Sequence, residues 1–259
     1  MVNFEYKSSY NVYDLKNLVK ELRGEGGCPW DREQTHESIR RNFLEEAYEA
    51  VEAIDEKSTA HLREELGDVL LQVIFHAQME EEVGSFDLDA VADECCKKLI
   101  LRHPHVFGDV KAETPDEVLT NWDDIKRVEK QQKTVTDAMD SVAKTLPALW
   151  RAEKIQKKAA KVGFDWPDAT GAYEKLREET DELERASTDK EQFEELGDIL
   201  FSAVNAARLL KIDPEDALQA SSDKFIRRFE KVERAATDKG TSLSDMSLEE
   251  LDKLWESVK

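Results

Sequence analysis

Hydrophobic positions recur with a helical period along most of the chain. Within residues 60–83, six apolar side chains share one sector about 100° wide when each residue is turned by about 100°: Leu62, Leu66, Val69, Leu70, Val73 and Ala77. This stripe is predicted to face a core. Leu71, Phe75 and Met79 form a second apolar stripe on the opposite side. Because two of its faces are apolar, this helix is expected to lie in an enclosed, largely apolar environment.

The same periodicity predicts helices in two successive series. The first series covers residues 11–23, 37–57, 60–83, 87–102 and 116–132, and the second covers 145–161, 169–186, 190–211, 214–236 and 247–258. Asp87 and Asp213-Pro214 suit helix starts, because Asp is a good N-cap and Pro fits the first helical position. Only ten Gly and six Pro occur in 259 residues, about half the average share. The chain is therefore predicted to be all-α, and an all-β or collagen-like chain is excluded.

The chain contains an internal repeat. Residues 65–77 read ELGDVLLQVIFHA and residues 195–207 read ELGDILFSAVNAA. Four further pairs of residues recur in the same order: Trp30 with Trp166, Glu46 with Glu179, Lys98 with Lys224, and Trp122 with Trp255. Their offsets are 136, 133, 126 and 133 residues, and the two ELGD segments, which come third along the repeat, are offset by 130 residues. We predict two homologous helical domains, 1–135 and 136–259, with the boundary in the polar stretch 129–140.

Charge and composition limit the possible partners. The formal net charge is −21, which excludes a nucleic acid polymer as partner because phosphate backbones need a basic face. A nucleotide bound through a divalent cation stays possible, since the cation reverses the local charge. No apolar stretch approaches the length of a membrane span. Three cysteines, two of them adjacent, cannot build a disulfide framework, and the cytoplasm is the expected location.

Acidic side chains gather beside the double apolar stripe. Asp68 lies at the head of the second stripe and Glu65 borders both stripes, while Glu46 and Glu49 share a face of the preceding helix. If the two helices pack antiparallel, four carboxylates converge and repel one another until they are protonated or bind a metal. The second repeat has the same arrangement in Glu179, Glu182, Glu195 and Asp198. Solvated surface acids are the alternative, and their recurrence in both repeats argues against it.

The residue types available as metal ligands in the second repeat indicate which metal the site would bind. All five histidines and all three cysteines lie within the first 105 residues, but the acidic pattern recurs without them. A site common to both repeats therefore has oxygen ligands alone, which favours Mg²⁺, with Mn²⁺ as a possible substitute, over Zn²⁺.

Basic residues recur in register as well. Lys224 and Arg228 are one helical turn apart and suit an anionic group, and Lys98 with Arg102 is the matching pair. Trp255 with Lys259, matched by Trp122 with Lys126, offers a flat face and a charge to a base and a phosphate. Surface solvation of the basic pairs and core packing of the tryptophans are the alternatives.

These motifs resemble those of the MazG nucleoside triphosphate pyrophosphohydrolases. The family signature EExxE followed by ExxD occurs in both repeats, beginning at Glu45 and at Glu178. The resemblance covers essentially the whole chain and includes the segments GCPWD, RHPHVFGD, LPALWRAEKIQKKAAKVGFDW and KFIRRFEKVE. It implies a tandem pair of all-α helical-bundle domains, assembled as a homodimer or a larger oligomer. The implied reaction is Mg²⁺-dependent hydrolysis of an NTP or dNTP to the monophosphate and pyrophosphate, with a role in nucleotide-pool clean-up.

The resemblance also implies roles for individual residues. In the second repeat the implied metal ligands are Glu179, Glu182, Glu195 and Asp198, and the implied nucleotide-binding residues are Lys224, Arg228, Trp255 and Lys259. The same roles carry over to Glu46, Glu49, Glu65, Asp68, Lys98, Arg102, Trp122 and Lys126 in the first repeat. We further expect Glu178 or Glu179 to accept the proton of the attacking water.

Two other classes of function remain open at this point. One is a non-catalytic helical module that binds a nucleotide or a protein and signals through its oligomer. The other is a helical dimerisation scaffold whose acids are merely solvated. Neither reading explains by itself why acids, bases and tryptophans recur in register.

Overall fold

The computed structural model describes residues 4–111, 114, 117, 118, 122, 125, 129 and 132–259. It separates into two compact units, Met1–Lys126 and Arg127–Lys259. All regular elements in the described ranges are helices, so the predicted all-α class is confirmed. The domain boundary predicted between residues 135 and 136 differs from this division by the segment 127–135, part of which lies outside the described residues.

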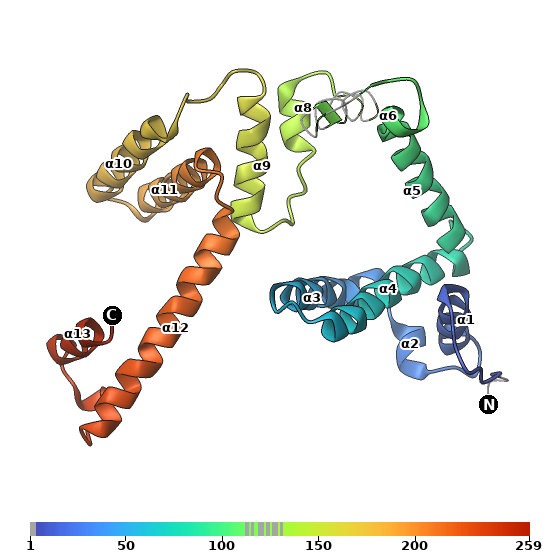
Figure 1. Ribbon diagram of the computed structural model, residues 1–259, viewed down its shortest axis with the longest axis horizontal. Helices are drawn as coiled ribbons and strands as arrows, with labels where there is room; N and C mark the ends of the chain where they lie inside the picture. The colour runs from blue at the N-terminus through green and yellow to red at the C-terminus, as the bar shows by residue number, and fades with distance from the viewer. Residues whose placement is uncertain are drawn as a thin grey trace. The chain divides into compact units, whose positions relative to one another are not determined.

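The N-terminal unit is built around a pair of long helices (Figure 1). Its described helices are α1 (Val12–Arg23), α2 (Pro29–Glu33), α3 (His36–Asp55), α4 (Thr59–Glu82), α5 (Leu88–Arg102) and α6 (Pro104–Phe107). Helix α4 packs against α3 over most of its length, and also against α1 and α5. The core between these helices consists of Val19, Ile39, Ile74, Phe75 and Met79.

The C-terminal unit repeats this pairing (Figure 1). Its helices are α8 (Val135–Asp140), α9 (Ala148–Ala160), α10 (Ala169–Arg185), α11 (Asp189–Leu209), α12 (Pro214–Asp238) and α13 (Leu248–Ser257), with the short 3₁₀ turn η1 (Leu243–Asp245). Helices α10 and α11 form the main pair, and α9 packs against α11. Helix α12 starts beside α9 and α11 and then runs away from them, and α13 folds back on its far half.

Matching helices of the two repeats start at matching positions. The starts of α1 and α9, α3 and α10, α4 and α11, and α5 and α12 differ by 136, 133, 130 and 126 residues, as the sequence repeat predicts. The caps explain why the starts are so well defined. Asp87 and Asp213 accept hydrogen bonds from backbone N–H groups of the first turns of α5 and α12, and Pro214 occupies the first helical position.

One predicted apolar face is more exposed than expected. The apolar stripe predicted to face the core of α4 is partly open, because Leu66 and Leu70 are 54% and 36% exposed, whereas Phe75 and Met79 of the second stripe are buried. That part of the prediction was wrong, because periodicity identifies apolar faces but not the partner of each face. The helix predicted at 116–132 lies mostly outside the described residues. No helix in the described ranges is long and apolar enough to cross a membrane.

Candidate functional site

Three carboxylates converge between α10 and α11. One oxygen each from Glu179, Glu182 and Glu195 lies within 4.8 Å of the other two. Glu179 and Glu182 are adjacent on one face of α10, and Glu195 lies in the second turn of α11, which returns alongside α10 after a short connection. Asp198, the fourth predicted ligand, lies outside this 4.8 Å group but is close enough for its charge to act on Glu195. Three of the four carboxylates that were predicted to converge therefore do so.

The N-terminal unit contains the equivalent cluster. Oxygens of Glu46, Glu49 and Glu65 also lie within 4.8 Å of one another, at the packed faces of α3 and α4. Asp68 again stands outside the group and acts through its charge. Each acid occupies the same position relative to the start of its helix as its counterpart in the C-terminal unit.

The clusters disfavour the ionised state of their own carboxylates. Burial raises the pKa of Glu195, and the charges of Glu182, Glu179 and Asp198 raise it further. Burial likewise raises the pKa of Glu46, with Asp68 and Glu49 as the next causes. Since a cation would remove this repulsion, both clusters are electrostatically suited to one.

The donor atoms fit a hard divalent cation. Glu65 is 7% exposed, and its Oε2 is buried with no hydrogen-bond partner in the described structure. Such an orphaned oxygen is costly unless a proton or a cation satisfies it. In the C-terminal cluster all candidate donors are carboxylate oxygens, which suit Mg²⁺ or Mn²⁺.

Lys175 is a site residue that the sequence reasoning missed. Its Nζ lies 2.6 Å from Glu179 Oε1 and 2.9 Å from Glu178 Oε1, and these hydrogen bonds raise the pKa of the lysine. The i,i+4 spacing from Lys175 to Glu179 was a visible signal. The internal repeat does not point to Lys175, because Asn42 occupies the equivalent position in the N-terminal repeat. Glu178 itself is exposed and lies outside the carboxylate group.

A cavity of about 690 Å³ adjoins the C-terminal cluster. Glu179 and Lys175 line one side of it, and the rest of its wall comes from α8, α9, the loop after α9, and α11. Its lining residues are Met139, Ile155, Gln156, Ala159, Gly163, Phe164, Asp165, Trp166, Lys175, Glu179, Phe201, Ser202, Asn205 and Arg208. A largely apolar pocket with a few fixed polar groups beside a charged cluster is typical of a ligand site.

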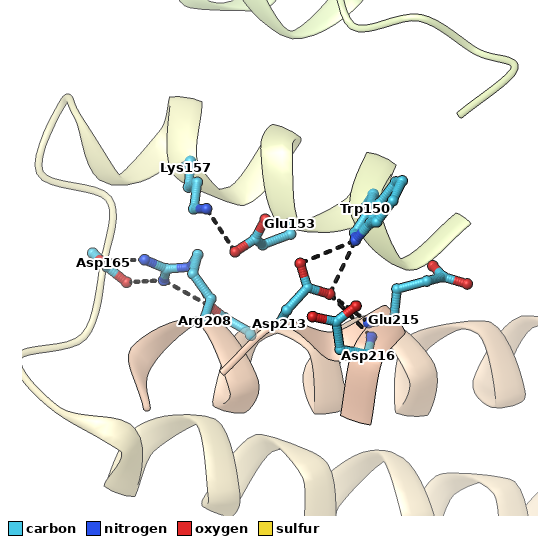
Figure 2. A network of polar contacts seen from close by, with 9 residues as sticks. Trp150, Glu153, Lys157, Asp165, Arg208, Asp213, Glu215 and Asp216 are labelled. Carbon is cyan, nitrogen blue, oxygen red and sulfur yellow. Dashed lines mark hydrogen bonds and ion pairs between the residues drawn. The ribbon is translucent and has the colours of Figure 1, made fainter. Parts of the chain in front are cut away.

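Polar contacts join the loop after α9 to α11, and α9 to the start of α12 (Figure 2). Arg208 donates to both carboxylate oxygens of Asp165, with Nη1 to Oδ2 at 2.9 Å, and also to the side-chain oxygen of Asn205. The Arg208 hydrogen bond is the main reason why the pKa of Asp165 is lowered. The Trp150 indole N–H donates to Asp213, with Nε1 to Oδ1 at 2.9 Å, and ties the start of α12 to α9.

In the N-terminal unit the equivalent space is filled. At the helix offsets above, Ala159 and Asn205 correspond to Arg23 and Phe75. Phe75 is 6% exposed in the core, and the Arg23 guanidinium lies 5.1 Å from its ring centroid. Arg23 also donates to Glu82, with Nε to Oε1 and Nη2 to Oε2 each at 2.8 Å, and to the carbonyl of Asp31. The acidic cluster is therefore common to both repeats, but the wall beside it is not.

The structure does not join the predicted phosphate-binding residues of the C-terminal unit to its acids. Lys224 is exposed and Arg228 half-buried on α12, and the Arg228 guanidinium lies 6.0 Å from the Trp255 ring centroid. Lys259 pairs with Glu256. Within residues 132–259, no hydrogen bond or ion pair links Lys224 or Arg228 to Glu179, Glu182, Glu195 or Asp198.

The corresponding N-terminal residues are only partly placed. Lys98 is exposed and Arg102 half-buried on α5, and the Trp122 ring meets the His103 ring edge-on with centroids 4.8 Å apart. Lys126 lies outside the described residues. Their roles stay predictions.

Comparison with known proteins places the chain in a family. The sequence pattern of the MazG nucleotide pyrophosphohydrolase domain matches residues 34–107 and 170–233. The chain belongs to the MazG family. Both matched segments contain an acidic cluster, so the resemblance and the tandem MazG-type fold predicted from the motifs are confirmed.

Three relatives match almost the whole of this chain. The nucleoside triphosphate pyrophosphohydrolase/pyrophosphatase MazG of Thermotoga maritima is 46% identical over 246 residues, 95% of this chain and 94% of the relative. The nucleoside triphosphate pyrophosphohydrolase of Escherichia coli is 44% identical over 251 residues, 95% of each chain. YabN of Bacillus subtilis, whose function is uncharacterised, is 50% identical over 260 residues, 98% of this chain and 53% of the relative. The prediction that this MazG chain is an enzyme of the nucleotide pyrophosphohydrolase class is confirmed.

Proposed function

We propose that this MazG enzyme hydrolyses nucleoside and deoxynucleoside triphosphates between the α and β phosphates, releasing the monophosphate and pyrophosphate. The observation that carries the proposal is the carboxylate cluster of α10 and α11 beside a cavity of about 690 Å³. Relatives matched over about 95% of this chain are named nucleoside triphosphate pyrophosphohydrolases, which supports the proposal.

The acids are proposed to hold Mg²⁺. Glu179, Glu182, Glu195 and Asp198 are the ligands in the C-terminal unit, and Glu46, Glu49, Glu65 and Asp68 are their counterparts. Bound there, Mg²⁺ supplies charge neutralisation for the triphosphate and a lowered pKa for a bound water. Mn²⁺ offers the same chemistry to the same oxygen ligands.

The chain's own side chains supply positioning and proton transfer. Glu179 is 4% exposed at the cavity wall, and Lys175 holds it in place. Glu179, or its neighbour Glu178, accepts the proton of the attacking water. Lys224 and Arg228 neutralise charge on the departing pyrophosphate, because phosphoryl transfer depends mainly on positioning and electrostatics. Trp255 and Lys259 complete the nucleotide contacts.

The enzyme is proposed to act as a homodimer. Lys224 and Arg228 are not joined to the acids of their own chain, and α12 exposes Phe225 and Ile226, which are 56% and 65% exposed. On α11, Leu196 and Leu200 are 50% and 51% exposed beside the acidic cluster. Apolar residues open on both helices favour association, and a second copy would then bring its α12 to the acids of the first.

Complementation tests this assembly. Glu179→Gln and Lys224→Ala are each expected to be inactive alone. If each site combines residues of two copies, co-refolding the two variants yields mixed dimers in which one site is intact, and part of the activity returns. A monomer by light scattering, or mixtures as inactive as their components, would contradict the shared site.

A role in nucleotide-pool clean-up, with broad base tolerance, is the proposed physiological task. The cytoplasm is the proposed location, supported by Cys28, Cys95 and Cys96 as free thiols in the described structure.

Product identity is the decisive measurement. The protein is incubated with each common NTP and dNTP, with Mg²⁺ or with EDTA, and the products are separated. We expect monophosphate and pyrophosphate only when Mg²⁺ is present. Diphosphate with phosphate would place the cleaved bond elsewhere, and tight nucleotide binding without product would favour a non-catalytic module.

A further inference from the structure

His61 stands between two glutamates at the edge of the N-terminal acidic cluster. Its Nδ1 lies 3.1 Å from Glu56 Oε2, and its Nε2 lies 3.2 Å from Glu65 Oε1. Glu65 is one of the three converging carboxylates and is buried, whereas the His61 side chain is 34% exposed. The imidazole therefore reaches from solvent to a carboxylate of the cluster.

The short connection between α3 and α4 places this histidine. Glu56 is the C-cap of α3, and Lys57 follows it with a φ of 55°. Ser58 then caps α4 by accepting a hydrogen bond from the His61 N–H. His61 is thus the third residue of α4, and Glu65 lies one turn later on the same face. The connection and the first turns of α4 together bring the three side chains into line.

Glu56 determines which nitrogen of His61 carries a lone pair. An ionised carboxylate only accepts hydrogen bonds, so Nδ1 carries the proton in the contact with Glu56. In the neutral imidazole, Nε2 then presents its lone pair to an oxygen of Glu65. Two lone pairs at this distance require a cation, either a proton on Nε2 or a metal ion that both atoms bind. Metal-binding histidines are commonly held in this way, with the other nitrogen donating to a carboxylate.

The spacing of His61 and Glu65 fits two ligands of one ion. Ligand atoms about 2.1 Å from the same ion lie about 3.0–3.4 Å apart in octahedral and tetrahedral sites, and Nε2 and Oε1 are 3.2 Å apart. Oε2 of Glu65 is buried without a hydrogen-bond partner in the described structure. An ion pair with His61 alone leaves that oxygen unsatisfied, whereas a metal ion in the cluster places positive charge beside it.

We propose that the N-terminal cluster is a site for a divalent transition-metal ion, with His61 as a nitrogen ligand next to Glu65 and with Glu56 as the group that orients the imidazole. His61 stands outside the 4.8 Å group of carboxylates, as Asp68 does, and binds from its edge. The inference rests on the proposed metal-binding role of the carboxylates and assigns the two clusters different preferences. Mg²⁺ takes oxygen ligands, whereas an imidazole nitrogen favours transition metals.

The task of this ion differs from that of a catalytic metal. Phe75 and the Arg23 guanidinium occupy the space beside the N-terminal cluster and pack against each other. The ion therefore ties α3 to α4 close to their connection instead of meeting a substrate.

The C-terminal cluster lacks both parts of this arrangement. Glu191 is the third residue of α11, where α4 has His61, and it closes a capping box by accepting hydrogen bonds from the N–H groups of Ser187 and Thr188. Ala186 is the C-cap of α10, where α3 has Glu56. No histidine occurs in the sequence beyond residue 105. The C-terminal cluster therefore keeps oxygen ligands alone.

Mn²⁺ bound to the full chain tests the proposal, because pulsed electron paramagnetic resonance detects an imidazole nitrogen that coordinates this ion. Mn²⁺ has the lowest affinity of the first-row divalent ions for such ligands, which makes the test stringent. The parent chain carries Glu179→Gln and Glu195→Gln, which weaken the C-terminal cluster. The signal of free Mn²⁺ gives the affinity, and displacement by Mg²⁺ gives the preference between the two ions.

Three variants are compared with this parent. His61→Gln removes the nitrogen ligand, and Glu56→Ala removes the orienting carboxylate. His36→Gln is the matched control, since His36 also pairs with a glutamate of α4, with Nε2 2.8 Å from Glu80 Oε1, but lies outside the cluster. Circular dichroism confirms that each variant is folded.

We expect a nitrogen signal in the parent and in His36→Gln, and none in His61→Gln. Mn²⁺ affinity should fall at least about tenfold in His61→Gln. It should fall about tenfold in Glu56→Ala, the usual cost of losing the partner that orients a metal ligand. Mg²⁺ affinity should change less than about threefold in His61→Gln, and His36→Gln should bind both ions like the parent.

The proposal is overturned if the parent binds no Mn²⁺, if its bound Mn²⁺ gives no nitrogen signal, if that signal survives in His61→Gln, or if His61→Gln and Glu56→Ala both bind Mn²⁺ like the parent. His61 would then only form ion pairs with its two glutamates. Failure of the proposed function looks different: the nitrogen signal would be present and would be lost in His61→Gln, while the wild-type chain released no pyrophosphate from any triphosphate.

Discussion

The N-terminal and C-terminal repeats keep the same acidic cluster but differ in the space beside it. In the C-terminal repeat, Ala159 and Asn205 border a cavity. In the N-terminal repeat, Arg23 and Phe75 stand at those positions and pack against each other within a core. The two repeats therefore differ at two positions on neighbouring helices. In one repeat these residues border a cavity that can receive a ligand, and in the other they pack together and stabilise the fold.

This difference shows that the signature motif contains only some of the residues that form a site. Three acidic positions on two helices are enough to build the cluster, and both repeats satisfy that requirement. A nucleotide site also needs room for the rest of the substrate. That requirement depends on α1 or α9 and on the far end of α4 or α11, which the motif does not include.

The largest expected effect concerns the two equivalent glutamates. We expect Glu179→Gln to lower kcat for ATP by at least about a hundredfold, because it removes a charge from the cluster beside the cavity. Glu46→Gln should change kcat less than about threefold. Steady-state kinetics with matched Mg²⁺ concentrations check the pair. Equal losses in both variants would mean that the N-terminal repeat also catalyses.

A smaller effect is expected on stability, in the opposite repeat. Phe75→Asn removes a core aromatic ring and buries an amide, and should destabilise the N-terminal unit by about 3–5 kcal/mol. Asn205→Ala should cost the C-terminal unit about 1 kcal/mol, the value of a typical hydrogen bond. Calorimetric melting of each variant tests this order. A Phe75→Asn protein that melts like wild type would show that the filled space is not part of the core.

The smallest effect is the pH dependence of metal-free stability. Because burial and then neighbouring carboxylates raise the pKa of Glu195, the folded state binds its proton more tightly than the unfolded state. The stabilisation of the folded state that this tighter proton binding provides is complete below the unfolded pKa of about 4.3. It is lost as the pH rises through the pKa of Glu195 in the folded state. Glu195→Gln should therefore melt higher than wild type at about pH 8 and should lose that advantage at about pH 4.

Added Mg²⁺ provides the control for this prediction. It should raise the melting temperature of wild type at about pH 8 more than that of Glu195→Gln, since the variant has one ligand charge fewer. The same titration with Glu65→Gln compares the two repeats. If Mg²⁺ stabilised wild type and both variants equally, neither cluster would be its binding site.

The sequence predicted the helices and the acids well because both are local features. Caps such as Asp87 and Asp213 define the helix starts, and a spacing of three residues puts Glu179 and Glu182 on one face. Short helices such as α2 and α6 were missed, because four or five residues are too few to display a period. Their positions are set by Pro29 and Pro104 at the first helical turn.

Features that depend on packing were not predictable in the same way. The cavity is lined by residues of separate helices, among them Ala159 on α9 and Asn205 on α11, and no single segment contains that information. Lys175 joins the site in one repeat only, so the repeat pattern does not predict it. The exposure of Leu66 and Leu70 reflects which partner each apolar face meets, and an apolar pattern does not specify partners.

The paired helices of the two repeats differ in length by a constant amount. Helices α10 and α11 have 17 and 21 residues, and their counterparts α3 and α4 have 20 and 24. Each C-terminal helix is three residues shorter, close to one turn of 3.6 residues, yet the acids keep their distances from the helix starts. Divergence thus altered the ends farthest from the starts and left the ligand positions unchanged. Insertions or deletions of about one turn at those far ends are the changes in length that a protein engineer can make without moving the carboxylates.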